Sequence, residues 1–202
     1  MDQGQAREMW QKADESGLTA MIAHEFRFAP ARAYVKELIE QGYVGDILSI
    51  HMTLYRGPTQ SQGPRPLAWG SESAQGGGFL GALGAHFIDC FRDWSGEVAR
   101  VSGSAFVHNP DRLDPASGQI VASDADQAFS FTLAFENGGW GSMAANSVAP
   151  FGSGGWNVCN VFKTGNSNGC TRFLRFENRW KALIETGPAV FEIIKHGYQG
   201  RK

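Results

Sequence analysis

After Gly96, apolar residues recur at every second position, and this alternation constrains the fold more than any other feature of the sequence. It runs over residues 101–108 and again over 129–135, where small polar residues separate the apolar ones. The Asn137-Gly138 pair that follows is a strong hairpin signal. The same pattern predicts further strands near 140–148, 156–163 and 170–176. A period of two places one apolar face on a core and leaves a polar face for water or a second subunit, so we expect a meander of antiparallel strands.

Before Gly96, helical periodicity predominates. Residues 3–16 carry one apolar stripe, Pro30 opens a second helix that ends near Gly42, and a third helix is predicted over 79–94. The other predicted elements are a buried-type strand over 18–26, a half-buried strand over 48–55, long loops at 56–78 and 109–125, and a helix near 188–196. The predicted fold class is therefore α+β: an open, mainly antiparallel sheet of about six strands with helices packed on one face.

Charge and cysteine content exclude several functional classes. Lys and Arg number 18 against 20 for Asp and Glu, and this net charge of -2 lacks the basic excess that nucleic acid or an anionic membrane surface attracts. No apolar run approaches the ~18 residues of a membrane span, and residues 1–16 are too polar for a secretory signal. The three cysteines form no CxxC pair, which is typical of a reducing compartment, so we predict a cytoplasmic location.

The run Gly76-Gly77-Gly78-Phe79-Leu80-Gly81 matches the GxGxxG pattern of dinucleotide-binding turns and precedes a predicted helix. That mechanism also needs a buried strand feeding the turn and an acidic residue about 20 positions later. Residues 65–75 lack the pattern of a buried strand, so we assign no cofactor-binding residue. The histidines are scattered without metal-ligand spacing, so we predict no metal site either.

The helix predicted over 79–94 has a second, polar side shared by Ala82, His86, Asp89 and Asp93. His86 precedes Asp89 by three positions, within reach for a side-chain pair, and an imidazole held by a carboxylate commonly serves as a general acid or base. The alternative is a surface histidine on a solvated face. Arg27 lies where the predicted strand meets a helix. It either binds an anion or a sugar hydroxyl, or it caps a nearby carboxylate.

Three segments carry a resemblance to a known family. They are His24-Glu-Phe-Arg27-Phe-Ala-Pro30 with the following helix up to Gly42-Tyr-Val-Gly45, the Gly-rich helix from Gly76 to Asp89, and the strands from Phe129 to Ala145. Together they resemble the second domain of the glucose–fructose oxidoreductase, inositol dehydrogenase and MocA (Gfo/Idh/MocA) family. The resemblance covers about residues 1 to 162 and rests on the first two motifs occurring together.

The resemblance implies a function. Members of this family have an N-terminal Rossmann domain that binds NAD or NADP, and a C-terminal α+β domain that holds a sugar or cyclitol and mediates oligomerisation. It implies that His86 is catalytic, that Arg27 and Asp89 bind substrate, and that the cofactor binds outside this chain. The expected partners are a polyol or sugar and a second copy bound through the sheet. Relatives often carry Asp at the position of Ala82, and Asp89 is expected to substitute for it in part.

The family pattern also predicts a domain organisation. Residues 1–26 correspond to the last helix and strand of a Rossmann domain that is otherwise missing from this chain, and residues 27–202 to the substrate and oligomerisation domain, with 163–202 departing from the pattern. The chain would then be a fragment, a mispredicted start or half of a split enzyme. Two hypotheses follow: the substrate-binding and catalytic half of an NAD(P)-dependent oxidoreductase, or a non-catalytic binding or scaffold module that dimerises through its sheet.

Overall fold

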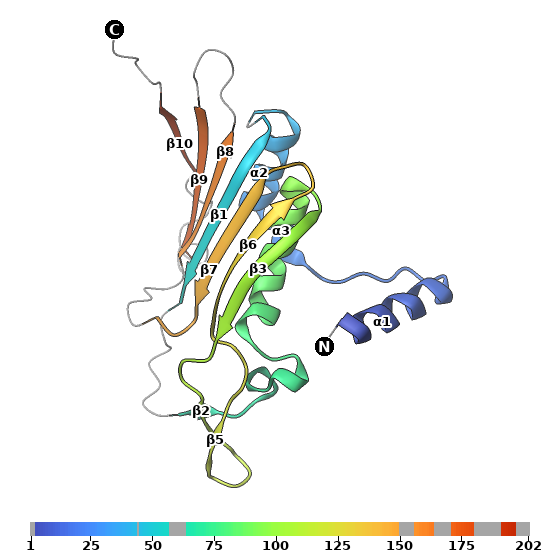
Figure 1. Ribbon diagram of the computed structural model, residues 1–202, viewed down its shortest axis with the longest axis vertical. Helices are drawn as coiled ribbons and strands as arrows, with labels where there is room; N and C mark the ends of the chain where they lie inside the picture. The colour runs from blue at the N-terminus through green and yellow to red at the C-terminus, as the bar shows by residue number, and fades with distance from the viewer. Residues whose placement is uncertain are drawn as a thin grey trace.

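A seven-stranded sheet forms the body of the molecule in the computed structural model (Figure 1). The structure describes residues 3–43, 45–56, 64–149, 156–163, 171–179 and 191–196. The strand order is β10-β9-β8-β1-β7-β6-β3, and only the β1–β7 pair is parallel. The strands are β1 (Ile47–Tyr55), β3 (Val98–Phe106), β6 (Ala128–Phe135), β7 (Trp140–Asn146), β8 (Trp156–Lys163), β9 (Thr171–Arg179) and β10 (Phe191–His196). The open, mainly antiparallel sheet predicted from the alternation is thus confirmed, with one strand more than expected.

Two helices, α2 (Pro30–Glu40) and α3 (Ala85–Ser95), cover one face of this sheet (Figure 1). The core between helices and sheet is Val35, Leu38, Ile50, Met52, Leu54, Phe87, Cys90, Phe91, Trp94, Phe129, Phe131, Leu133, Phe135, Met143 and Ala145. Every second residue of β1, β6 and β7 contributes to it, as the alternation predicts. Burying each large side chain contributes about 2 kcal/mol, so this interface fixes α3 against the sheet.

On the opposite face of the sheet, the described side chains of β1 and β7 include polar and aromatic residues, as predicted. His51 Nδ1 lies 2.8 Å from Ser142 Oγ, and the His51 ring meets the Trp140 ring edge-on at 4.4 Å. Trp140 is 48% exposed. None of the helices that the structure describes lies over this face (Figure 1).

A small second sheet lies within the segments predicted as loops. It has the order β2-β4-β5 and consists of β2 (Arg65–Pro66), β4 (Asp111–Leu113) and β5 (Ile120–Ala122), and two 3₁₀ turns, η2 (Trp69–Ser71) and η3 (Ser73–Gln75), follow β2. The buried Arg112 side chain links this sheet to the turns, because its guanidinium donates to Ser71 Oγ and to the carbonyl of Asn109. Strands of two or three residues are too short to show a period in the sequence.

Two predicted elements are wrong. The predicted strand over residues 18–26 is irregular up to His24 and continues as the 3₁₀ turn η1 (Glu25–Phe28). A strand of this buried type depends on neighbours for its backbone hydrogen bonds, and no described strand pairs with it, so apolar side chains such as Met21 (81% exposed) face outward. The segment near 188–196, predicted as a helix, contains the strand β10 instead, because the edge of β9 provides the partners for its backbone hydrogen bonds.

The predicted helix over 3–16 is confirmed as α1 (Gln3–Ser16), which lies apart from the sheet and has no buried residue (Figure 1). Its apolar stripe, including Trp10, is exposed. The assignment of residues 1–26 to a Rossmann domain stays a prediction. In the part of the chain that the structure describes, we find no helix with the length and apolar character that crossing a membrane requires.

Candidate functional site

The Gly-rich run positions the start of the histidine-bearing helix. Asp126 Oδ2 accepts a hydrogen bond from the Leu80 amide at 2.8 Å, and its carbonyl accepts one from the Phe79 amide at 2.9 Å. Gly78 has a φ of +116°, and a Cβ there would overlap the Asp126 carboxylate. A Cβ at Gly77 would lie 2.7 Å from the Glu72 carbonyl oxygen. These glycines are therefore required for contacts within the protein, and Asp126 takes the place that a phosphate would occupy at such a helix start.

The first turn of this helix is π-helical, η4 (Leu80–Gly84), and α3 continues from it. Single π turns inside helices are frequent at functional sites. Gly84 is required where the turn meets the sheet, because a Cβ there would lie 2.8 Å from Leu80 Cδ1 and 3.0 Å from Phe129 Cζ. At Gly84 the helix therefore approaches β6 closely.

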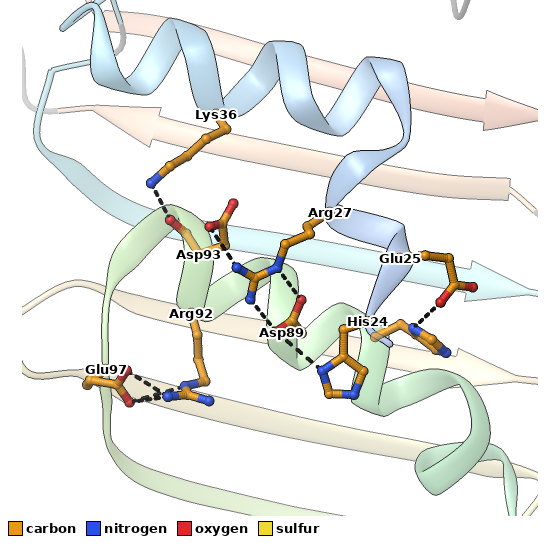
Figure 2. Close-up of polar contacts among 9 residues, drawn as sticks. His24, Glu25, Arg27, Lys36, Asp89, Arg92, Asp93 and Glu97 are labelled. Atoms are coloured by element: carbon orange, nitrogen blue, oxygen red, sulfur yellow. Dashed lines mark hydrogen bonds and ion pairs between the residues drawn. The ribbon is translucent and has the colours of Figure 1, made fainter. Parts of the chain in front are cut away.

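The turn η1 is joined to α3 by an ion-pair network (Figure 2). Arg27 Nε donates to Asp89 Oδ2 at 2.7 Å, Nη2 donates to Asp89 Oδ1, and Nη1 donates to Asp93 Oδ1 at 3.2 Å. His24 Nδ1 lies 3.3 Å from Asp89 Oδ1. Lys36 Nζ, from α2, donates to the Asp93 carbonyl at 2.7 Å. The Asp89 carboxylate is buried, but it has two partners: the Arg27 guanidinium and the His24 imidazole.

The electrostatics follow from this geometry. The hydrogen bond from Arg27 lowers the pKa of Asp89. The electrostatic effects of Arg27 and His24 lower this pKa further, while burial raises it. The same hydrogen bond raises the pKa of Arg27. One residue further on, burial raises the pKa of the Cys90 thiol to about 12. The Arg27–Asp89 pair is therefore charged at neutral pH, and the adjacent thiol is a neutral core group.

His86 lies beside this network. Its ring stacks on Phe26 with the centroids 4.2 Å apart and meets the His24 ring edge-on at 5.3 Å. Nδ1 is buried and lies 3.5 Å from Glu25 Oε2, within range for an ion pair but without a hydrogen bond in the described part of the chain. The His86 side chain as a whole is 19% exposed, and among the described residues no hydrogen bond is made by Nε2. The His86 ring is thus held by packing against Phe26 and His24 and stays partly exposed.

The structure corrects one expectation for the site. His86 and Asp89 do not pair, although their spacing allows it, because Arg27 and His24 occupy both Asp89 oxygens. Of the two alternatives for Arg27, capping a carboxylate describes its contacts. His24 and Glu25 were missed by the sequence reasoning. The predicted strand places neighbouring residues on opposite faces, whereas the η1 turn brings His24, Glu25 and Arg27 to the same helix.

This arrangement can exchange a proton. A partly exposed imidazole with a carboxylate near one of its nitrogens is a common arrangement of a general acid or base. Within the described residues, no three His, Cys, Asp or Glu side chains are placed to hold a metal ion.

Comparison with known proteins defines the class first. The fold matches a levoglucosan dehydrogenase solved with NADH and levoglucosan, with a TM-score of 0.72 and 23% identity, over 95% of this chain and 50% of that chain. Residues 33–167 match the model of the GFO/IDH/MocA C-terminal domain. The chain therefore belongs to the Gfo/Idh/MocA oxidoreductase family, as its motifs predicted.

Curated relatives extend the comparison. The chain is 30% identical over 152 residues to an uncharacterized oxidoreductase of Synechocystis, covering 74% of this chain. It is 28% identical over 158 residues to levoglucosan dehydrogenase of Pseudarthrobacter phenanthrenivorans, covering 72% of this chain. The chain spans 40% of the length of each of these two relatives.

Proposed function

We propose that this chain is the substrate-binding and catalytic half of an NAD(P)-dependent oxidoreductase that acts on a sugar, cyclitol or related polyol. Membership of the family supports the reaction class, and the name of one relative, levoglucosan dehydrogenase, supports a carbohydrate substrate. The observation that carries the proposal is the partly exposed imidazole of His86, whose ring stacks on Phe26 and has the Glu25 carboxylate 3.5 Å from Nδ1.

The cofactor is assigned to a Rossmann domain outside this chain. The described residues do not fit a dinucleotide, because Asp126 caps the helix that follows the Gly-rich run and the glycines contact the protein itself. The nicotinamide supplies the hydride acceptor where it is bound. In this proposal the chain binds the polyol, and Nε2 of His86 accepts the proton of the polyol hydroxyl group.

Arg27 and Asp89 were predicted to bind substrate. Their contacts are with each other, with His24 and with Asp93, and Asp89 is only 7% exposed. We propose that they contribute chiefly by holding η1 against α3, which places Glu25 and Phe26 beside the His86 ring.

The test joins this chain to the nucleotide-binding domain of levoglucosan dehydrogenase and follows NADH or NADPH formation with levoglucosan, D-xylose and an inositol. His86→Asn is expected to lower kcat by about 10²- to 10⁴-fold, the usual contribution of a positioned general acid or base. His108→Asn is the matched control, because His108 lies outside this network. Unchanged turnover in His86→Asn would contradict the proposal.

The alternative is a non-catalytic module that dimerises through its sheet. The observation that favours it is the polar face with the exposed Trp140, which no described helix covers. Sedimentation of the chain and of Trp140→Ser distinguishes the cases. A dimer that Trp140→Ser dissociates, together with activity independent of His86, supports the module. A dimer with activity that depends on His86 supports an oligomeric enzyme.

A further inference from the structure

The carboxylate nearest to the His86 ring comes from the preceding turn and not from its own helix. Glu25 Oε2 lies 3.5 Å from Nδ1, which is buried and has no hydrogen-bond partner among the described residues. A buried imidazole nitrogen without a hydrogen-bond partner destabilises the folded state, so a partner within reach is favoured. The Glu25 side chain is 66% exposed, so a change of its rotamer is the movement that would bring the carboxylate to the roughly 2.8 Å of a charge-assisted hydrogen bond.

Other charged groups near the ring are already occupied. Asp89 is held by Arg27 and His24, and His24 meets the His86 ring edge-on, without a hydrogen bond between the rings in the described structure. The Arg32 guanidinium lies 4.9 Å from the centroid of Phe26, the ring on which His86 stacks. Ala82, on the preceding turn of the same helix, has no side chain able to pair. Glu25 alone among these residues faces Nδ1.

We infer that Glu25 is the positioning residue of His86: its carboxylate accepts a hydrogen bond from Nδ1–H, so that Nε2 presents a lone pair to the substrate. The inference rests on the proposed function for its role in catalysis. The substrate hydroxyl proton passes to Nε2, Nδ1 keeps its own proton, and the Glu25 carboxylate stabilises the imidazolium without taking up a proton. The proton on Nε2 then leaves to solvent, and a nicotinamide held by the domain outside this chain would supply the acceptor for the carbon-bound hydride.

This placement changes how the site is built. A carboxylate on the same helix is fixed relative to the imidazole by helix geometry, whereas Glu25 approaches from η1, whose position depends on the Arg27–Asp89 pair. The Phe26 ring next to it in sequence holds the imidazole plane, so one short turn supplies both the packing surface and the acceptor.

The proton position is measured directly by NMR on the chain itself, without cofactor or turnover. The ¹⁵N shifts of the two ring nitrogens of His86, assigned with His86→Asn, show which nitrogen carries the proton at about pH 9, where imidazoles are neutral. We expect the Nδ1–H tautomer to predominate. In Glu25→Ala we expect the ratio to reverse toward Nε2–H, and in Glu25→Asp to be partly restored. Glu8→Ala, on the distant α1, is the matched control.

Each outcome bears on the inference. Predominance of Nε2–H in the unmodified chain would overturn it, as would an Nδ1–H form that Glu25→Ala leaves unchanged. Because both measurements are independent of turnover, they can succeed even if the enzyme proposal fails. If both hold, Glu25→Ala in the fused enzyme is expected to lower kcat with little change in KM, as loss of a group that orients the base requires.

Discussion

Arg27 and Asp89 lie 62 residues apart in the chain and form a two-pronged ion pair, with Nε donating to Oδ2 and Nη2 to Oδ1. The Arg27 side chain is one-third exposed, whereas Asp89 is nearly buried. The pair is therefore the polar joint between η1 and α3, beside the apolar contact of Phe26 with Phe87.

Arg27→Met is expected to destabilise the protein by about 2 kcal/mol, below the 3–5 kcal/mol of a fully buried pair, because solvent screens its exposed side. The loss leaves the Asp89 carboxylate with His24 as its remaining partner. Urea unfolding followed by circular dichroism measures the change. Arg92→Met is the matched control, since the Arg92–Glu97 pair is on the surface, and its midpoint is expected to stay unchanged. Equal effects of the two variants would contradict a special role for Arg27.

Acid should weaken the fold partly through Asp89. Its pKa in the folded protein lies below the ordinary value of 3.8, chiefly because Arg27 donates hydrogen bonds to it. The unfolded chain therefore takes up a proton at a higher pH, so the stabilisation is present above pH 3.8 and is lost as pH falls through the native value. Asp89→Asn is expected to flatten the fall in unfolding free energy below about pH 4. An unaltered acid slope in this variant would refute the assignment.

The Cys90 thiol should be unreactive in the folded protein. It is fully buried and its pKa is raised to about 12, so at pH 8 almost no thiolate forms and reagents cannot reach it. Iodoacetamide labelling followed by peptide mass spectrometry is expected to modify the Cys90 peptide only in urea. Modification of the native protein at the rate of a small thiol would show that α3 opens locally.

Gly78 and Gly81 should respond in opposite directions to alanine. Gly78→Ala combines a left-handed φ of +116° with an overlap on the Asp126 carboxylate, so we expect a loss of about 2–4 kcal/mol. At Gly81 the nearest atom to an added Cβ is 3.6 Å away, and the backbone φ lies outside the left-handed region. Gly81→Ala is therefore expected to be neutral or to stabilise the protein by up to about 1 kcal/mol. Thermal unfolding of the two variants tests this, and a larger loss for Gly81→Ala would contradict the structure.

The periodic elements could be predicted because burial itself creates the period. The even-numbered residues Ile50, Met52 and Leu54 of β1 are buried, as are the odd-numbered ones of β6, so alternation in the sequence identified both strands. The helical stripe of α2 was visible for the same reason. The strand predicted over 18–26 failed because its apolar run would need neighbouring strands, which no local pattern can supply.

The site was harder to predict. The polar face of α3 identified His86 and Asp89, but their partners come from η1, and no periodicity shows that a short turn will meet a given helix face. Two carboxylates, Asp89 and Glu25, could have been the neighbour of His86. The Arg27 guanidinium binds both Asp89 oxygens, so the carboxylate that lies near His86 is that of Glu25. Such competition depends on three-dimensional geometry that sequence spacing does not contain.

The π-helical turn at Leu80–Gly84 allows two demands on one helix to be met together. Upstream, the Leu80 amide must reach Asp126; downstream, Phe87 and Phe91 must enter the core with the imidazole beside Phe26. One residue added to a helix rotates its two ends relative to each other by about 100°. If one residue of this turn were deleted, the helix could keep either the hydrogen bond from the Leu80 amide to Asp126 or the position of the His86 ring beside Phe26, but not both. A one-residue deletion should therefore damage the site more than any single side-chain replacement in the same turn.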